Sequence, residues 1–221
     1  MAVTAPTRAA DAPAVVEPGV PELPAATPAT DPTRPSALPR GTTVLGMVLA
    51  LAAEGMILGV VIAVYFTIKA GSPLWPPSGV GLNTYIPTVV SITAAMSACS
   101  AGWLLVSTKR NDQRSAFSAS ILSVVLGLAM ANGQWYSLTQ AGFSVGDHAY
   151  GTLFHLLMGL HLLHLVAGIV MLIVVGGQTL AGHFGSDDHE PVSATVYFWQ
   201  YGNALWSVIV VILFIVGPHA Q

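Results

Sequence analysis

The chain has 221 residues, of which 53% are apolar, while 7 Lys and Arg and 10 Asp and Glu amount to only 8% of the sequence and give a net charge of -3. A soluble globular domain carries roughly 25% charged residues, so this composition excludes an ordinary soluble protein. So few basic residues also exclude nucleic acid as a partner, because no basic patch is available to neutralise phosphates. The single cysteine, Cys99, excludes a disulfide framework and any CxxC metal or redox motif.

Residues 1–40 have the composition of a disordered tail. They hold nine Pro and ten Ala with scattered Thr, and they show neither helical nor alternating apolar periodicity. No apolar core follows a basic start, which argues against a secretory signal, and three early acidic residues argue against a transit peptide: Asp11, Glu17 and Glu22. We expect a solvated, Pro/Ala-rich N-terminal tail, followed by a membrane domain at residues 41–221.

Five long apolar segments follow the tail, at about residues 43–68, 84–108, 115–140, 150–177 and 193–217. Each exceeds the roughly 20 residues that span about 30 Å of hydrocarbon at 1.5 Å per residue. Backbone polar groups find no partner in lipid and must bond within their own segment, so the segments are predicted to be helices. The predicted fold class is therefore all-α, a polytopic membrane helix bundle with five transmembrane helices.

The basic residues predict the orientation, because Lys and Arg stay preferentially on the cytoplasmic side of a membrane. Five of them lie before the first helix or between the second and third, whereas Lys69 alone lies on the opposite side; the five are Arg34, Arg40, Lys109, Arg110 and Arg114. We expect the N-terminus to be cytoplasmic and the C-terminus to lie outside.

Glu54 is the one formally charged residue deep in a predicted span. A charge at the centre of a membrane helix costs about 2.5–3.5 kcal/mol on insertion scales, so we expect this side chain to be neutral, paired or turned toward other helices. Two interpretations fit. Glu54 is either a functional group or a protonated carboxyl that makes one interhelical hydrogen bond for packing.

The fourth predicted helix carries three histidines. At 3.6 residues per turn His161 and His164 share a face, and His155 is displaced from it. The pair is suited to hydrogen bonds across to another helix or to binding a metal ion. A bis-His haem is not expected, because it needs histidines on two helices and the other four lie in loops or at ends. Copper or zinc needs three or four ligands, and Glu54 is the obvious further donor, so hydrogen bonding is favoured over metal ligation.

Amide side chains in the third and fifth predicted helices are further candidates. Gln134 lies near the end of the third helix beside two aromatic residues, and Gln200 and Asn203 lie a turn apart in the fifth. The aromatic residues around them are typical of interfacial belts at the headgroup level; they are Trp135, Tyr136, Tyr197, Phe198, Trp199 and Tyr201. The amides must find partners across helices, so Gln134, Gln200 and Asn203 join Glu54, His161 and His164 in a predicted intramembrane polar site.

Four segments, taken in chain order, carry a resemblance to a known family: AAEGMILGVVIAVYF with Glu54, WPPSG at 75–79, YGTLFHLLMGLHLLHLVAG at 150–168 and FWQYGNALW at 198–206. They resemble segments of subunit III of haem-copper (cytochrome c) oxidases, including its Ser-Glu-x-Met-x-Phe and Gly-Phe-His-Gly-Leu-His stretches. The match places Glu54 on the family's membrane Glu and His161 and His164 on its two histidines. Gly133 with Gln134 is similar to a Gly-Gln pair of the family.

The sequence also departs from the family's pattern. Gln200 and Asn203 stand where the family usually has His and Asp, and Ser137 replaces a frequent Glu. Ser193 or Glu190 must serve for a Glu before the last helix, and the family's usual seven helices are reduced to a five-helix form. These losses of ionisable groups suggest a divergent paralogue.

The resemblance implies a non-redox accessory subunit III of a terminal oxidase in aerobic electron transport, in a bacterial plasma membrane. It further implies that this chain binds no cofactor, that haem and copper lie in the partner subunits, and that structural phospholipids occupy a V-shaped cleft. Subunit I is the main expected partner, with subunit II in the same complex, and the expected roles are proton uptake, oxygen access and complex stability. Glu54, Trp75 and His155 are the cleft candidates. We expect Glu54 to contact the fourth helix through His164 or His161.

Two other functions are kept as alternatives. The first is the accessory subunit of a nitric oxide reductase system, which the altered residues of the fifth helix favour. The second is an unrelated five-helix transporter or b-type cytochrome. The sequence has no clear internal repeat, and this weakens the transporter interpretation because secondary transporters are commonly built from inverted repeats.

Overall fold

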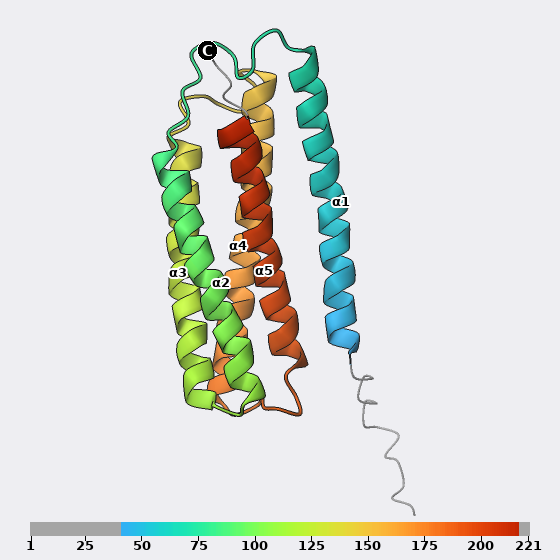
Figure 1. Ribbon diagram of the computed structural model, residues 1–221, viewed down its shortest axis with the longest axis vertical. Helices are drawn as coiled ribbons and strands as arrows, with labels where there is room; N and C mark the ends of the chain where they lie inside the picture. Colours follow the sequence, from blue (N-terminus) through green and yellow to red (C-terminus); the bar gives the residue numbers. More distant parts are fainter. Residues whose placement is uncertain (1–40, 217–221) are drawn as a thin grey trace, which may run out of the picture. The chain divides into compact units, whose positions relative to one another are not determined.

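The computed structural model describes residues 41–216, which form five long helices lying side by side (Figure 1). They are α1 (Thr42–Gly71), α2 (Tyr85–Lys109), α3 (Gln113–Thr139), α4 (Ala149–Leu180) and α5 (Glu190–Val210), which continues as the π-helical segment η1 (Val211–Val216). All five are long and apolar enough to cross a membrane, so the predicted all-α, five-span fold is confirmed, with helix ends predicted to within three residues. The predicted tail at residues 1–40 lies outside the described residues.

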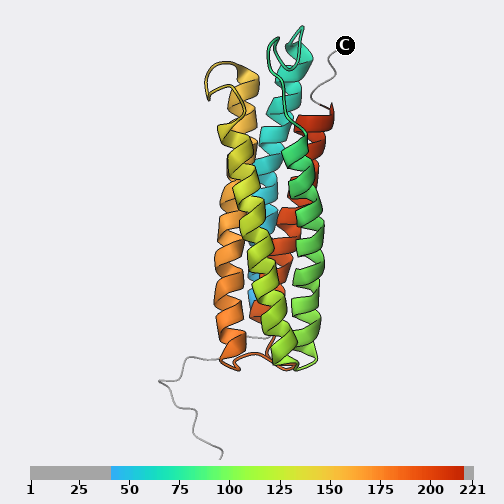
Figure 2. The same cartoon turned by 90° about the vertical axis from the view of Figure 1, so that its left-hand side faces the viewer.

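The loops alternate between the two ends of the helices (Figure 2). In the loop between α2 and α3, the Asp112 carboxylate accepts a hydrogen bond of 3.0 Å from Ser115 N and caps the start of α3. Hydrogen bonds from Ser115 hold the pKa of Asp112 below its usual value. Asn111 has a φ of 57° and exchanges two hydrogen bonds with Ser186 of the α4–α5 loop, so the two loops at this end are joined.

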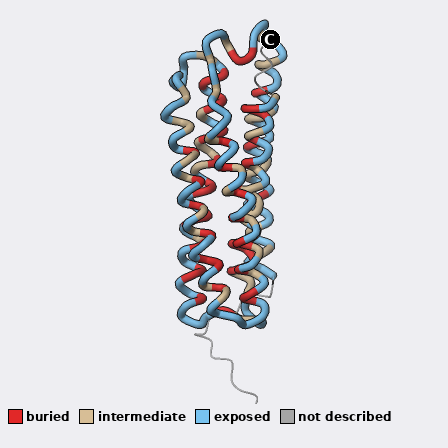
Figure 3. Tube along the Cα trace, turned by 60° about the vertical axis from the view of Figure 1, so that its left-hand side comes forward, coloured by how far each residue is buried: buried red, intermediate tan, exposed pale blue. Residues whose placement is uncertain are grey.

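Four of the helices close into a bundle. α2 and α4 each pack on both α3 and α5, and the buried residues concentrate on the faces that these helices turn toward one another (Figure 3). Trp199 of α5 lies at the centre: a Cβ on Gly127 of α3 or on Gly168 of α4 would come within 2.6 or 2.7 Å of its indole ring. Its Nε1 donates to Ser97 Oγ of α2 at 2.8 Å. Trp199 therefore joins all four helices of the bundle.

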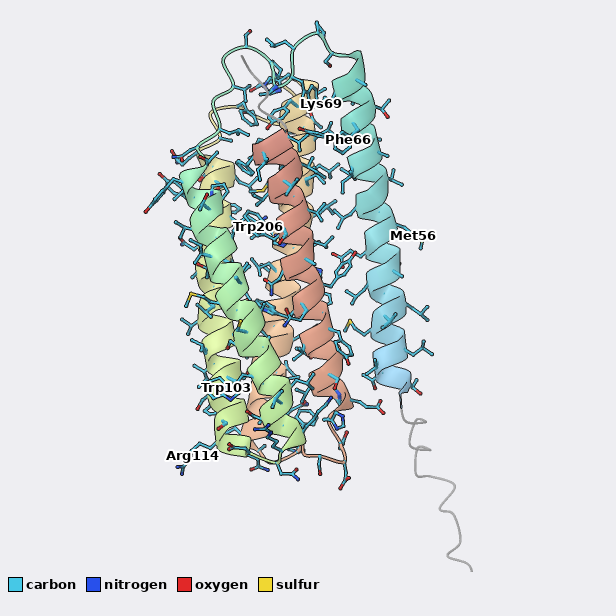
Figure 4. All side chains as sticks on the ribbon, in the orientation of Figure 1. Met56, Phe66, Lys69, Trp103, Arg114 and Trp206 are labelled. Atoms are coloured by element: carbon cyan, nitrogen blue, oxygen red, sulfur yellow. The ribbon has the colours of Figure 1, made fainter. Side chains whose placement is uncertain are left out.

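The remaining helix, α1, packs on α4 and α5 along a narrow stripe. Its buried residues are Leu51, Leu58 and Tyr65, each seven positions from the next, whereas Met56 points away from the other helices (Figure 4). Polar contacts hold α1 near its ends. Gly41 N donates to Glu190 Oε1 at 2.5 Å, Tyr65 Oη donates to Ile212 O at 3.3 Å, and Lys69 Nζ donates to Val216 O at 2.7 Å.

Candidate functional site

A carboxylate and an imidazole meet between α1 and α4 in the middle of the spans. His164 Nδ1 lies 2.8 Å from Glu54 Oε1 and 3.0 Å from Oε2. The His164 side chain is 2% exposed and that of Glu54 is 29% exposed. The predicted contact between Glu54 and the fourth helix is therefore present, through His164 rather than His161.

The other side of the His164 ring is fixed by α5. Its Nε2 lies 3.1 Å from the backbone oxygen of Phe198, and the two rings stack with their centroids 3.9 Å apart at an angle of 6°. A Cβ on Gly202 would come within 2.6 Å of Nε2, so only glycine lets α5 approach this closely. Glu54 of α1 and Phe198 of α5 thus hold the His164 ring in one orientation.

These contacts fix how many protons the pair carries. The Phe198 carbonyl only accepts hydrogen bonds, so His164 Nε2 carries a proton. One further proton lies between Nδ1 and the Glu54 carboxylate, bonded either to the nitrogen or to an oxygen. In both arrangements the net charge of the pair is zero. A neutral pair suits the low dielectric of a membrane interior, where a lone charge is costly.

His161 forms a second polar network one turn away on α4. Its Nε2 lies 3.0 Å from Gly202 O, and its Nδ1 lies 2.9 Å from Gln134 Oε1, while Gln134 Nε2 donates to Met158 O at 2.8 Å. The residue is 1% exposed, and its ring centroid lies 6.4 Å from that of His164. Both ring nitrogens face acceptors, but a neutral imidazole carries one proton. In a neutral His161, one of the two ring nitrogens therefore faces its acceptor without a hydrogen.

The structure separates the six predicted polar residues into two groups. His161 and His164 lie on α4, and Gln134 of α3 and Glu54 of α1 bond to them. Gln200 and Asn203 instead lie on the side of α5 that faces α2, where Gln200 Nε2 donates to Ala98 O at 2.8 Å. The Asn203 amide nitrogen is buried without a hydrogen-bond partner.

The three predicted cleft residues do not come together. Trp75, in the loop after α1, packs edge-on against Tyr65 and Tyr150, with ring centroids 5.3 and 5.2 Å away. His155 lies on α4, and its Nδ1 bonds to Gly151 O of its own helix at 2.8 Å. Glu54 lies 11 positions before Tyr65 on α1, so Trp75 is at a different depth.

Sequence reasoning assigned Tyr201 to an aromatic belt, but it adjoins the site. Its ring centroid lies 5.9 Å from that of His164, and a Cβ on Gly55 would come within 2.7 Å of its hydroxyl. Tyr201 therefore lies against α1 beside Glu54. One sequence feature pointed to this position of Tyr201: it is three positions after Phe198 and so lies on the same side of α5.

No group of three or more His, Cys, Asp or Glu that is able to hold a metal ion occurs within residues 41–216. What the described side chains assemble is a set of hydrogen-bonded imidazole, carboxyl and amide groups. Such groups are able to join helices and to hold or exchange protons.

Comparison of the amino-acid sequence with known proteins assigns the chain to a family. The profile of the cytochrome c oxidase subunit III family matches residues 35–218. The chain is 23% identical over 173 residues to cytochrome c oxidase subunit 3 of Thermostichus vulcanus, covering 78% of this chain and 86% of the relative. It is 28% identical over 176 residues to cytochrome c oxidase subunit 3 of Hippopotamus amphibius, covering 76% and 67%. It is 26% identical over 178 residues to a Mycobacterium leprae protein named probable cytochrome c oxidase subunit 3, covering 78% and 87%. The chain belongs to the cytochrome c oxidase subunit III family.

Proposed function

We propose that this subunit of cytochrome c oxidase, an oxidoreductase complex, is a non-redox accessory subunit that supports proton uptake, oxygen access and the stability of the complex. It packs on subunit I, with subunit II in the same complex, and the haem and copper reside in those partners. The Glu54–His164 pair carries the proposal, because it is an ionisable pair at mid-membrane depth. The relatives described above are all cytochrome c oxidase subunits, which favours oxygen over nitric oxide chemistry for the complex.

The protonation pattern of the site supports a role in proton uptake. The proton between Glu54 and His164 is able to move from one residue to the other without changing the net charge of the pair. Glu54 is 29% exposed, so its carboxyl also faces the outside of the α1–α4 contact.

The packing of α1 supports roles in stability and oxygen access. This helix buries a stripe one residue wide, so its polar contacts to α4, α5 and η1 contribute much of its attachment. Most of its other side chains are apolar and exposed, among them Leu49, Ile57 and Val60, and they offer a surface to structural phospholipids. Oxygen is apolar and dissolves in the same hydrocarbon. The excess of basic residues at the α2–α3 loop favours a cytoplasmic N-terminus in a bacterial plasma membrane.

Co-purification tests this function. Extraction of the full chain from its native membrane in a gentle detergent is expected to recover it with a haem-copper subunit, detected by the haem spectrum of the complex and by peptide mass spectrometry. The chain separated from that complex is expected to show no Soret band. Recovery of the chain alone from an otherwise intact membrane would contradict the accessory role, and haem bound to the isolated chain would contradict the non-redox role.

A further inference from the structure

A groove on the outer side of the bundle follows the contact between α3 and α4. It has a volume of about 290 Å³ and is lined mostly by apolar residues, namely Phe117, Ser120, Ile121, Val124, Val125, Ile173, Gly176 and Gly177. Gly176 packs so closely on α3 that a Cβ at this position would clash with the Ser120 hydroxyl oxygen. A Cβ on Gly177, in contrast, would meet nothing within 4 Å. The missing side chain at Gly177 therefore leaves the groove open.

The lining of the groove favours a hydrocarbon chain over a helix. Ser120 is the one lining residue with a polar side chain, and its Oγ already donates to Leu172 O at 3.0 Å. The exposed lining residues Ile121, Val125 and Ile173 are bulky. Membrane helices associate through small residues and interhelical hydrogen bonds, and the groove offers neither on its exposed side. A thin, flexible, apolar chain needs no hydrogen bond and fits between bulky side chains.

The groove is about one leaflet deep. On α3, which begins at Gln113, its lining runs from Phe117 to Val125. At 1.5 Å per residue the distance from Gln113 to Val125 is about 18 Å, and one leaflet contributes about half of the roughly 30 Å of hydrocarbon. On α4 the lining lies within the last two turns before Leu180. A transmembrane helix crosses both leaflets, whereas a lipid acyl chain extends from the headgroup level to the middle of the bilayer.

A basic side chain lies at the headgroup end of the groove. Arg114 is three positions before Phe117 and seven before Ile121, so it is on the side of α3 that lines the groove. It is exposed and points away from the bundle at the end of α3 (Figure 4). Lys109 and Arg110 are exposed in the same loop, and none of the three forms an ion pair with another described side chain. Their charges are available to a ligand.

The charges at this end of the molecule are unevenly distributed. The α2–α3 loop carries three basic residues and one acidic residue, Asp112, and so has a net charge of +2. The other acidic residues, Asp187, Asp188 and Glu190, come just before or at the start of α5, and Glu190 Oε1 accepts a hydrogen bond from Gly41 N beside α1. The groove on α3 is therefore next to the basic loop, and its headgroup end favours an anion.

We propose that the α3–α4 groove binds an anionic phospholipid of the leaflet that the α2–α3 loop faces, with one acyl chain in the groove and its phosphate at Arg114. A guanidinium is able to bond two phosphate oxygens at once. A zwitterionic lipid carries its own cation beside the phosphate, so the net charge of the loop favours an anionic lipid. The site is separate from the lipid surface of α1, and none of Glu54, Trp75 and His155 lines it.

Photoactivatable lipids in native membranes test the proposal. Membranes that contain the full chain are fused with phosphatidylcholine vesicles that carry a probe with a diazirine in its acyl chain, either phosphatidylglycerol or phosphatidylcholine, and labelled peptides are identified by mass spectrometry. The phosphatidylglycerol probe is expected to label residues 117–125 and 173–177 about fivefold more than the phosphatidylcholine probe, the scale of attraction between one basic residue and an anionic headgroup. Equal labelling by the two probes, or no labelling of these residues, would overturn the proposal.

Matched substitutions test the two parts of the site separately. Gly177→Leu fills the groove and is expected to lower its labelling by both probes, whereas Gly59→Leu, at an exposed glycine of α1 where a Cβ also meets nothing within 4 Å, leaves it unchanged. Arg114→Gln is expected to remove most of the preference for phosphatidylglycerol, and Arg114→Lys to keep most of it because the charge remains. Unchanged labelling in Gly177→Leu would contradict the acyl-chain site, and an unchanged preference in Arg114→Gln would contradict the phosphate site.

Discussion

Replacement of Trp199 by alanine is expected to destabilise the chain by about 3–5 kcal/mol, the range for removal of a buried Trp or Phe side chain. Trp199 is 2% exposed, and its indole lies against the glycines at positions 127 and 168. The substitution leaves a cavity where α3, α4 and α5 meet and also leaves Ser97 Oγ without its donor. The neighbouring backbones are already in close contact and have little freedom to fill the space.

Trp103→Ala is the matched control, because Trp103 lies on α2 and is 44% exposed toward the lipid side. Unfolding of the full chain in mixed micelles, followed by the loss of helical circular dichroism, gives the two free energies of unfolding. The Trp199 variant is expected to unfold at a much lower denaturant concentration than the control. Similar midpoints for the two variants would show that Trp199 does not hold the four helices together.

Replacement of His164 by leucine is expected to destabilise the chain by about 3 kcal/mol, the lower end of the range for breaking a buried ion pair. The lower end applies because Glu54 is 29% exposed. Leucine preserves much of the volume but leaves the Glu54 carboxyl without its partner at mid-membrane depth, and the stacking with Phe198 is lost. The substitution therefore weakens the attachment of α1 to α4.

His155→Leu is the control for this change, since His155 lies on the same helix and bonds to its own backbone. A double-mutant cycle with Glu54→Leu isolates the contact. The double variant is expected to be more stable than the sum of the single effects predicts, by about 1–2 kcal/mol, as for other hydrogen bonds between membrane helices. Additive effects would mean that the two side chains do not interact in the folded chain.

The positions of the membrane spans were predictable from sequence. Which side of each helix packs against other helices was not. Long apolar runs between Gly, Pro and charged residues gave the helix ends to within three residues. In a membrane, however, residues that face lipid and residues that face other helices are both apolar, so little periodicity marks the buried side. Nothing in the sequence of α1 therefore distinguished buried Leu58 from exposed Ile57.

Because buried and lipid-facing apolar residues look alike in the sequence, only the ionisable residues of the site could be predicted directly. Glu54 and His164 were found because an ionisable residue is conspicuous in an apolar span and requires a partner. Trp199 was assigned to an interfacial belt on residue type alone, yet it lies nine positions into α5 and is buried, whereas Trp135, near the end of α3, is 60% exposed. Buried and interfacial aromatic residues can be told apart only when the packing of neighbouring helices is known. The same knowledge is needed to place Gln200 and Asn203 on the α2 side of α5, apart from Glu54 and His164.

Sustained turnover of the intact oxidase carrying Glu54→Gln or Glu54→Leu tests the central claim, that the Glu54–His164 pair supports proton uptake without touching the redox centres. Both variants are expected to keep the haem spectrum of the unmodified complex. The glutamine amide still donates to His164 Nδ1, so this variant is expected to retain the subunit as the unmodified complex does, while the leucine variant loses part of it. The glutamine variant nevertheless has no proton to exchange at this position, and its activity is expected to decline faster during turnover. Turnover of the glutamine variant as durable as that of the unmodified oxidase, or a change in its haem spectrum, would contradict the account.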